Sequence, residues 1–397
     1  MSDDNQPPHP ETIAIRAGRR PGDPALAPTL WSSSAFVTPT LDDANKMATS
    51  TSSTAFYSRY GNPTVAAFEG AIAELEGAEA ARAFSSGMGA ITAVVLGLCS
   101  KGDHIVSQRQ IYGGTQLLLN AVCPRFGIDV TFVDGTDPDA WDAAIRPGKT
   151  VLCLAETPAN PRLDLVDLDR LGQIRGPMTV VDSTFATPLG QQPLRHGVDL
   201  VIHSATKAIG GHNDATLGVV AGSRELLDWI WGFAVLQGAN ASPFDAMNGL
   251  RGLRTLAVRL RQQSESAADL AEMLEGDDRV SNVRALSLDS FPQRELVRRQ
   301  MTNTGGLLTF DVIGGVEGGR AFAESTQIAQ LATSLGGPET LVTHPASTTH
   351  VGLLPEELLE AGISPGTIRM SVGLEHVADL RRDVLAALAV AAARSGA

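Results

Sequence analysis

The sequence predicts an α/β protein with a mostly parallel sheet, and two observations lead to this prediction. Short apolar runs rich in β-branched residues recur along the chain, and segments with helical spacing separate several of them. Strands that alternate with helices favour crossover units and a sheet that is covered on both faces. The chain also has 397 residues, which exceeds one ordinary hydrophobic core and indicates more than one domain.

The first 61 residues lack the pattern of a self-burying unit. Proline, serine and threonine are frequent there, as in Ser32–Ser34 and Thr49–Thr54, and apolar periodicity is weak. Such a segment cannot bury enough apolar surface to order itself. We therefore expect residues 1–61 to form an arm that is either disordered or packed on another subunit.

Residues 62–255 carry the clearest alternation and are expected to form the large domain. Helical spacing covers Thr64–Leu75 and Gly89–Leu98. Ligands on sheets of this kind lie beyond the carboxyl ends of the strands, which directs attention to the residues that follow each strand. The expected strands are His104–Ser107, Val151–Glu156, Thr179–Asp182, Leu200–His203 and Leu217–Ala221.

Residues 256–397 are expected to form a smaller α/β domain. A helix-rich stretch begins near Ser242 and continues to about Glu275. The final helix is expected over Val377–Ala392, because Val377, Leu380, Val384 and Leu388 fall on one face at helical spacing. Between these helices the strands expected are Gly306–Val312, Thr340–His344 and Thr367–Val372.

Composition narrows the class of partner. Hydrophobic residues make up 43% and charged residues 19% of the chain, which is typical of a soluble globular protein. The formal net charge of −13 disfavours nucleic acid, because binding to the phosphate backbone needs basic patches. No run of 18 or more apolar residues occurs, and the acidic N-terminal segment has no apolar core, so we expect neither a membrane span nor a secretory signal.

The cysteines and histidines do not suggest a metal site. Cys99, Cys123 and Cys153 lie in apolar surroundings without the spacing of metal ligands. Buried thiols in a reducing compartment are the simpler expectation, and the location expected is cytoplasmic. His203 and His212 have no carboxylate or cysteine partners at suitable spacing, so packing and loop hydrogen bonds are expected of them.

The segment Ser85–Ala90 is a candidate phosphate cradle. It follows a short apolar run and precedes an apolar helix, and its glycines Gly87 and Gly89 let the backbone approach an anion. The start of a helix offers free N–H groups and a favourable dipole to that anion. A tight strand-to-helix turn without a ligand is the alternative. The dinucleotide fingerprint fits poorly, because Thr92 stands at its third glycine position.

Asp182 ends the expected strand Thr179–Asp182. An acid at the end of a buried strand is costly unless a partner offsets its desolvation. A cationic ring nitrogen would be such a partner, whereas a helix cap or a loop carboxylate is the alternative interpretation.

Lys207 closes the segment Ser204–Lys207, which directly follows the expected strand Leu200–His203. Its amine can condense with a carbonyl while the hydroxyls of Ser204 and Thr206 donate to a phosphate. A surface lysine is the alternative. Asp182 precedes Lys207 by 25 positions (207 − 182), so the two are expected on neighbouring strands at one sheet edge. Cradle, acid and lysine together predict a site for pyridoxal 5'-phosphate (PLP).

The chain resembles the transsulfuration (Cys/Met metabolism) family of PLP-dependent enzymes from about Thr12 to Leu388. This family includes cystathionine γ-lyase, methionine γ-lyase, cystathionine γ-synthase and the O-acylhomoserine sulfhydrylases. The resemblance implies PLP-dependent transferase fold type I, with a seven-stranded, mostly parallel sheet in the large domain. Its motifs are Tyr57–Thr64, Ser85–Ala90, Tyr112–Thr115, Glu156–Pro161, Asp182–Phe185, Ser204–Lys207, Ser334–Gly337, His344–Ser347 and Arg369–Gly373.

The resemblance implies a role for each matching residue in holding and using the cofactor. Lys207 forms a Schiff base with PLP and later moves protons, Asp182 pairs with the pyridine nitrogen, and Tyr112 stacks on the ring and is an acid–base candidate. The residues implied to hold the phosphate are Gly87 and Met88 through their backbone N–H groups and Ser204 and Thr206 through their hydroxyls.

The resemblance also implies substrate contacts and an assembly. Arg369 binds the substrate carboxylate through the two-pronged geometry that guanidinium suits best, with support from Asn160 and Ser334. Tyr57 and Arg59 reach the phosphate in a neighbouring subunit. A catalytic dimer, paired into a homotetramer, follows from this arrangement.

The reaction implied is γ-elimination on a sulfur amino acid such as cystathionine, methionine or homocysteine, giving 2-oxobutanoate, ammonia and a thiol. The alternative is γ-replacement on an O-acylhomoserine. Gly114 stands where methionine γ-lyases typically have cysteine, and Ala234-Val235 where lyases have a lysine-aspartate pair. Glu339 stands where cystathionine enzymes often have glutamate and sulfhydrylases lysine. A PLP-binding protein without turnover is a third interpretation, disfavoured because the set of site residues is complete.

Overall fold

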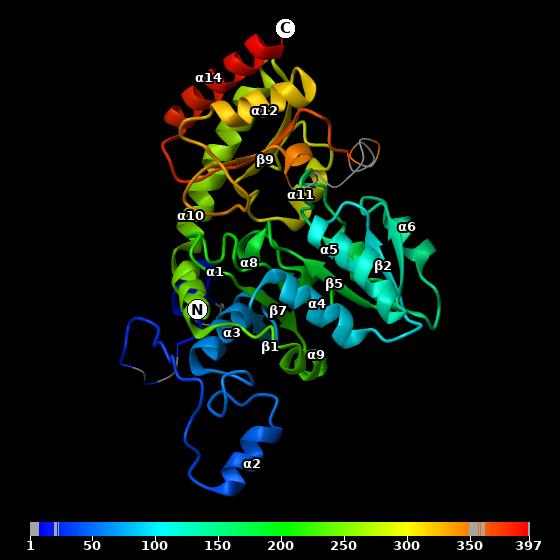
Figure 1. Ribbon diagram of the computed structural model, residues 1–397, viewed down its shortest axis with the longest axis vertical. Helices are drawn as coiled ribbons and strands as arrows, with labels where there is room; N and C mark the ends of the chain where they lie inside the picture. The colour runs from blue at the N-terminus through cyan, green and yellow to red at the C-terminus, as the bar shows by residue number, and fades with distance from the viewer. Residues whose placement is uncertain are drawn as a thin grey trace, which may run out of the picture.

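The computed structural model describes residues 8–19, 22, 24–348, 356, 358 and 362–395, and it contains two sheets. Figure 1 shows the smaller sheet with α12 and α14 at the upper end, the larger sheet below it, and helix α2 at the far lower end. The described chain therefore has a two-sheet body and an arm that extends from it.

The larger sheet has seven strands in the order β1-β7-β6-β5-β4-β2-β3. Only β7 runs antiparallel to its neighbours, so the expectation of a mostly parallel sheet is confirmed. The strands are β1 (Ala80–Phe84), β2 (His104–Gln108), β3 (Asp129–Val133), β4 (Thr150–Glu156), β5 (Met178–Asp182), β6 (Leu200–His203) and β7 (Gly218–Gly222).

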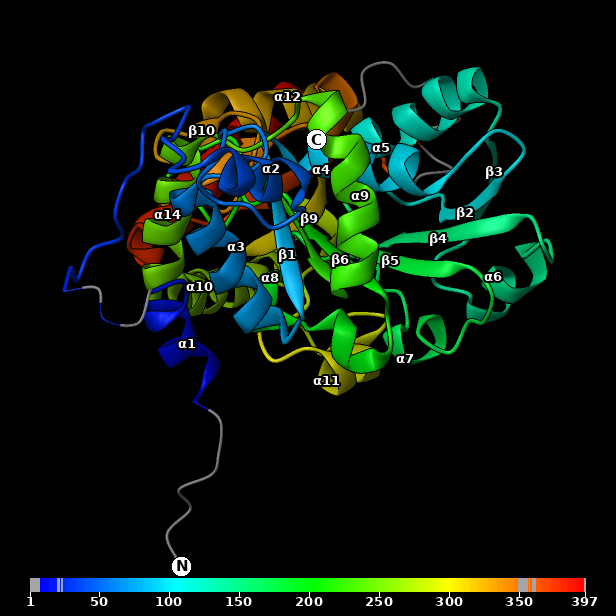
Figure 2. The same ribbon diagram turned by 90° about the horizontal axis from the view of Figure 1, so that it is seen from below.

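Helices cover both faces of this sheet because most of its strands are apolar on both faces. One face packs on α4 (Gly87–Leu98) and α9 (Arg224–Gln237), and the other on α3 (Pro63–Glu76) and α10 (Pro243–Glu275). Figure 2 shows β1 running between α3 and α9. Shorter helices join the strands: α5 (Gly113–Leu117), α6 (Pro138–Ala144), α7 (Leu168–Leu171) and α8 (Thr187–Gly190).

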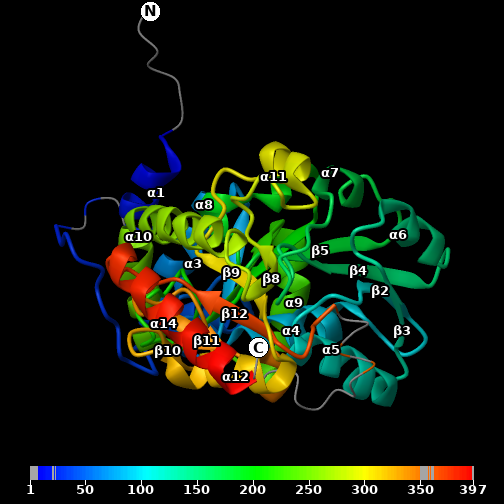
Figure 3. The same cartoon turned by 90° about the horizontal axis from the view of Figure 1, so that it is seen from above.

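The smaller sheet has five strands in the order β10-β11-β12-β9-β8. Helices α12 and α14 pack together and cover it, as Figure 3 shows from above. Its elements are β8 (Val280–Arg284), α11 (Arg294–Gln300), β9 (Leu307–Val312), α12 (Gly315–Ser325), β10 (Gln330–Leu331), β11 (Leu341–Thr343), β12 (Thr367–Ser371) and α14 (Val377–Ser395).

Helix α10 packs against both sheets. Ser242 caps its start through a side-chain oxygen that accepts from the Phe244 N–H, and Pro243 occupies its first turn. Its first half contributes Leu250 and Leu253 to the core beneath the large sheet, and its second half contributes Leu270 to the core of the small sheet. The boundary expected near residue 255 lies inside this continuous helix.

The arm leaves the body after α1 (Pro10–Arg16), carries α2 (Leu41–Thr49) and returns at Asn62. No side chain of α2 is buried. Asn62 ends the arm by capping α3, since its side chain accepts from the Thr64 N–H. Within the described part of the chain, none of the helices combines the length and apolar character that a membrane crossing needs.

Most expected elements are present within one or two residues of their predicted bounds, but α9 was not expected. Trp229 and Leu236 on this helix are exposed, so its apolar residues do not fall on one face. A sequence pattern of that kind does not show helical periodicity clearly.

Candidate active site

A cavity of about 460 Å³ lies beyond the carboxyl ends of β4, β5 and β6, and residues of the small sheet close it. Strand ends are where ligands bind on sheets of this kind. Ten of the predicted site residues line this cavity: Gly87, Met88, Tyr112, Asn160, Asp182, Ser204, Thr206, Lys207, Ser334 and Arg369.

Asp182 is held rigidly at the end of β5. Its Oδ1 accepts hydrogen bonds from the Thr184 N–H at 3.0 Å and the Thr184 hydroxyl at 2.5 Å. Its Oδ2 accepts none from the described residues, which leaves that oxygen available to a donor in the cavity. Burial raises the pKa of Asp182, whereas Thr184, His203 and Lys207 lower it. A cationic partner would therefore relieve a desolvated carboxyl.

Lys207 lies four residues beyond the end of β6. Its segment is hydrogen-bonded to the residues that follow the neighbouring strand β5. The Ser204 N–H donates to the Thr184 hydroxyl at 2.8 Å, and the Lys207 Nζ donates to Ser334 Oγ at 2.9 Å. Burial lowers the pKa of Lys207, Arg369 lowers it further, and Asp182 opposes the shift. A lowered pKa increases the neutral fraction of an amine, which is the form that attacks carbonyls and accepts protons.

The start of α4 provides the expected anion cradle. Ser86 caps the helix by accepting from the Gly89 N–H at 3.0 Å, while the N–H groups of Gly87 and Met88 have no acceptor among the described residues. A Cβ on Gly87 would lie 2.7 Å from the Ser204 Cβ, so only glycine allows this approach. The Thr206 hydroxyl exchanges hydrogen bonds with the Leu217 backbone, so a phosphate would share it.

Arg369 projects from β12 and is almost fully buried. Its Nη1 donates to Asn160 Oδ1 at 2.9 Å and its Nη2 to the Ser334 carbonyl at 3.0 Å. Its Nε is buried with no partner in the described structure. Burial lowers the pKa of Arg369 to about 10, against the opposing effects of Tyr112 and Glu156. An unsatisfied buried guanidinium N–H beside a cavity fits a carboxylate ligand.

Two buried residues here were missed by the sequence reasoning. Glu156 ends β4 and pairs in register with Asp182, and the same signal that selected Asp182, an acid at a strand end, would have found it. Arg259 on α10 donates to the Ala208 carbonyl at 2.8 Å, next to Lys207. Burial lowers the pKa of Arg259 to about 10, but no local pattern distinguishes it from a surface arginine.

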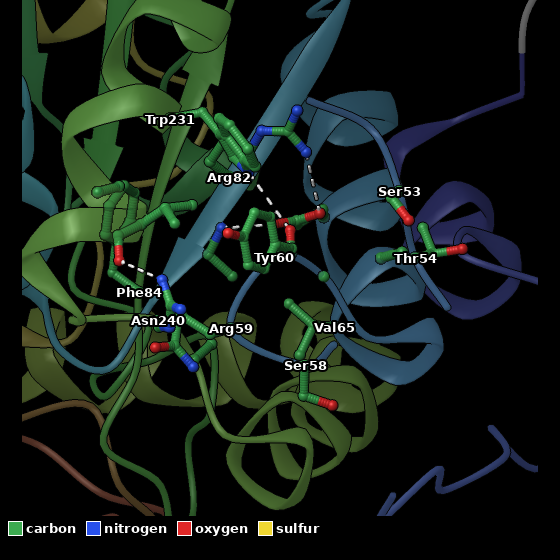
Figure 4. Close-up of a pocket in the computed structure, with 17 residues that line it drawn as sticks. Ser53, Thr54, Ser58, Arg59, Tyr60, Val65, Arg82, Phe84, Trp231 and Asn240 are labelled. Carbon is green, nitrogen blue, oxygen red and sulfur yellow. Dashed lines mark hydrogen bonds and ion pairs between the residues drawn. The ribbon is translucent and has the colours of Figure 1, made fainter. Parts of the chain in front are cut away.

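Tyr57 and Arg59 do not line the cavity. Arg59 lies in a small pocket between the arm and α9, where its Nη1 donates to the Val235 carbonyl at 3.1 Å (Figure 4). In the same pocket the Trp231 Nε1–H donates to the Tyr60 carbonyl at 3.3 Å. The chain therefore holds these arm residues away from its own cavity.

The histidines proposed and set aside as metal ligands have protein partners. His203 Nε2 lies 2.6 Å from Glu76 Oε1 in a fully buried pair, and His212 Nδ1 lies 2.8 Å from the Gly210 carbonyl. Among the described residues no group of three or more histidine, cysteine, aspartate or glutamate side chains is placed to hold a metal ion.

The groups around the cavity fit PLP on three independent counts. Free amides at the start of α4 suit a phosphate, the open Oδ2 of Asp182 suits a protonated ring nitrogen, and a lysine of lowered pKa suits an aldehyde. The fold and this site define the class of PLP-dependent enzymes.

Comparison with known proteins makes the assignment specific. Residues 11–389 match the family described as Cys/Met metabolism PLP-dependent enzyme, and the chain belongs to this family. An O-succinylhomoserine sulfhydrylase from Pseudomonas aeruginosa is 43% identical over 96% of this chain and 95% of the relative. An L-methionine gamma-lyase from Pseudomonas putida is 40% identical over 99% and 100%.

The structural comparison agrees. A cystathionine gamma synthase from Xanthomonas oryzae pv. oryzae, solved with aminoacrylate and cysteine, superposes with a TM-score of 0.91 at 38% identity. The match covers 98% of this chain and 100% of that one. The fold type expected from the resemblance is confirmed, and the chain is a PLP-dependent enzyme of the transsulfuration type.

Proposed function

We propose that this enzyme is a carbon–sulfur lyase, which performs γ-elimination on a sulfur amino acid such as cystathionine, methionine or homocysteine. The products are 2-oxobutanoate, ammonia and a thiol. One observation carries the proposal: Lys207, with a lowered pKa, shares a cavity with the buried carboxyl of Asp182 and with the unsatisfied Nε of Arg369. The cavity thus offers a proton carrier between a site for the cofactor ring and a site for the substrate carboxylate.

PLP, when bound, supplies an electron-accepting ring that makes the Cα proton of an attached amino acid acidic. Lys207 Nζ would accept the Cα proton, release it again, and only then accept a Cβ proton, and burial, which lowers the pKa of Lys207, favours its neutral, accepting form. The open Oδ2 of Asp182 would hold the proton on the ring nitrogen. Tyr112 lines the cavity with its ring exposed, so it would hold the cofactor ring by packing on it, and its phenol would move a proton to or from the amines that exchange.

Arg369 orients the substrate in this scheme. Its Nε and one Nη hold the carboxylate, while Asn160 and the Ser334 carbonyl keep the guanidinium plane fixed. Because Lys207 Nζ reaches Ser334 Oγ, the carboxylate clamp and the proton carrier meet at one residue. That proximity places the Cα of a clamped amino acid beside the amine.

Glu339 is the residue on which we base the preference for a sulfur amino acid with a distal ammonium group. Glu339 lies five residues beyond Ser334 (339 − 334), and its Oε2 accepts from Asn213, six residues beyond Lys207 (213 − 207), at 2.7 Å. Glu339 is exposed and does not line the cavity itself, and its carboxylate would attract the ammonium group of an approaching substrate and repel a succinyl carboxylate. Cystathionine carries such a distal ammonium group.

A γ-replacement on an O-acylhomoserine is the second candidate: one observation favours it, and another counts against methionine as a substrate of elimination. The relative that is 43% identical is named an O-succinylhomoserine sulfhydrylase. In addition, the Tyr112 ring fills the space beside Gly114, where an added Cβ would lie 2.6 Å from Tyr112 Cε1. The cysteine typical of methionine γ-lyases would therefore displace Tyr112, which counts against methionine as the preferred substrate.

A product screen separates the two reactions. The purified holoenzyme is given L-cystathionine, L-methionine, L-homocysteine or O-succinyl-L-homoserine, each with and without cysteine or sulfide, and 2-oxobutanoate is measured. We expect 2-oxobutanoate from cystathionine without an added thiol. If the succinyl ester is the only substrate consumed, and its release of succinate depends strongly on cysteine or sulfide, the reaction is replacement instead.

We also propose a catalytic dimer, paired into a homotetramer, in which Tyr57 and Arg59 of each chain serve the cavity of its neighbour. Two apolar side chains on the arm are almost fully exposed in the single chain, Val37 at 96% and Leu41 at 89%. This exposure supports the proposal that a neighbouring chain covers the arm. A cytoplasmic location is proposed as well, supported by three free cysteines that are all buried.

A further inference from the structure

We propose that Glu156 is a positioning residue, which fixes the distance between the cofactor-stacking segment at Tyr112 and the substrate clamp at Asn160. The inference rests on the roles proposed above for Tyr112 and Arg369. It adds a residue whose single carboxyl group positions both the cofactor-stacking segment and the substrate clamp.

The two oxygens of the carboxyl serve different segments. Oε2 accepts from the Tyr112 N–H at 2.8 Å, and Oε1 accepts from the Asn160 N–H at 2.8 Å. Tyr112 begins the loop that enters α5, whereas Asn160 lies on the loop that follows β4. Both oxygens of a carboxyl group can accept hydrogen bonds, so one such group can join two backbone donors.

The carboxyl itself cannot move to accommodate these segments. Glu156 is only 4% exposed, and its backbone pairs with Asp182 of the neighbouring strand β5. Its N–H donates to Gln108 Oε1 at 2.9 Å, and its carbonyl accepts from Gln108 Nε2 at 2.8 Å. The Glu156 carboxyl therefore holds the loops of Tyr112 and Asn160 at fixed positions relative to strand β4.

Each loop passes that position to a binding group. Asn160 Oδ1 accepts from Arg369 Nη1 at 2.9 Å, so a shift of Asn160 rotates the guanidinium. Tyr112 carries the ring proposed to pack on the cofactor. The charged groups that face Glu156 are Asp182, its partner in register, and Arg369. Both belong to the cavity, so Glu156 is part of the same electrostatic unit.

A substitution by glutamine isolates this role. Glu156→Gln keeps the size of the side chain but offers one acceptor oxygen and an NH₂ group that faces the other backbone N–H. We expect the Kd for L-norleucine, which carries no leaving group on Cγ, to rise about tenfold, since a buried donor loses its acceptor. The change in the absorbance of bound PLP reports this binding, and the Kd for PLP is expected to rise by a smaller factor.

Asp383→Asn is the matched control. Asp383 is also buried, at 7% exposure, and its carboxylate accepts three backbone N–H groups, from Gln327, Ile328 and Ala329. It does not line the cavity. We expect this variant to lower the melting temperature while both Kd values stay within twofold of the wild type. Glu156→Asp keeps two acceptor oxygens on a shorter side chain and is expected to bind norleucine more tightly than Glu156→Gln.

Norleucine binding separates this inference from the choice of reaction. It needs no cleavage at Cγ, so the result is the same for an elimination or a replacement enzyme. A folded Glu156→Gln variant with wild-type norleucine affinity, or an equal rise in Asp383→Asn, overturns the positioning role. A wild-type enzyme that binds PLP but responds to no amino acid overturns the proposed function, and this inference with it.

Discussion

The carboxyl end of the large sheet and the N-terminal arm differ in how far their side chains are buried and hydrogen-bonded within one chain. At the sheet end, the side chains of Glu156, Asp182 and Arg369 are buried, and most of their polar atoms have partners within the same chain. Along the arm, Val37 and Leu41 expose almost their whole side chains. Buried polar groups need partners to be stable, whereas exposed apolar groups gain by being covered.

The contacts that hold the arm explain part of this difference. Arg82 donates to the Thr51 carbonyl at 2.6 Å, Arg59 to the Val235 carbonyl, and Trp231 to the Tyr60 carbonyl. These bonds anchor backbone to the body and leave side chains such as Tyr57 exposed. One chain therefore satisfies most polar groups of its cavity, whereas it leaves apolar side chains of its arm uncovered.

Replacing Lys207 tests the self-contained region most severely. Lys207→Ala removes the amine proposed to hold the cofactor and carry protons, so we expect turnover to fall on the order of a thousandfold or more. Circular dichroism and the melting temperature should show a folded protein. Lys149→Ala, at an exposed lysine before β4, should keep wild-type turnover. Turnover of Lys207→Ala within tenfold of the wild type would contradict the role.

The substrate clamp should respond next most strongly. Arg369→Lys keeps a positive charge but loses the planar fork that reaches Asn160, Ser334 and the substrate carboxylate. We expect KM to rise about tenfold to a hundredfold, with a smaller fall in kcat. Steady-state kinetics with the best substrate of the product screen measure this. An unchanged KM would place the carboxylate elsewhere.

The arm makes a prediction that the cavity does not. Arg59→Ala is expected to lower turnover about tenfold, because a phosphate contact is lost. Co-expression with Lys207→Ala should then restore activity, since a mixed dimer has one site with both residues intact. An isolated mixed dimer should reach about half of the wild-type rate. Mixed dimers that recover nothing would show that Arg59 acts within its own chain.

The smallest effect concerns the two neighbouring carboxyls of the sheet end. Burial, followed by the charge of Asp182, raises the pKa of Glu156 from 4.5 to about 8. A folded-state pKa above the unfolded value gives stability that is complete below pH 4.5 and lost as the pH rises through 8. The free energy of unfolding of the apoprotein, relative to Glu156→Gln, should therefore fall by about 1.3 kcal/mol between pH 5.5 and 6.5. Urea titrations at both values measure it, and a constant difference would show that Glu156 titrates normally.

The sequence alone predicts the positions of site residues that lie at the end of a strand or the start of a helix. Asp182 and Lys207 were placed on neighbouring strands at one edge, and β5 and β6 are adjacent in the sheet. Gly87 was placed at a helix start, where α4 begins. These predictions hold because the end of a strand and the start of a helix are encoded locally.

Residues whose role depends on tertiary packing were not reached. The burial of Arg259 is created by the turn around Gly211, where an added Cβ would lie 2.0 Å from the Arg259 Nη1. Glu156 carried a local signal but was treated only as part of a motif, because its two backbone donors come from loops whose paths are not encoded nearby. The proposed role of Arg59 in a neighbouring subunit cannot be tested from the contacts of one chain, in which Arg59 donates to the Val235 carbonyl.

Helix α10, with 33 residues, is about 50 Å long and unbroken. It contributes Leu250 and Leu253 to one hydrophobic core and Leu270 and Leu274 to the other. If one core unfolds, the half of α10 that packs in it becomes exposed, and this destabilises the other half of the helix as well. Heating should accordingly give a single cooperative transition in calorimetry. Val258→Pro, at an exposed position of α10, should lower the midpoint of this transition or split it into two.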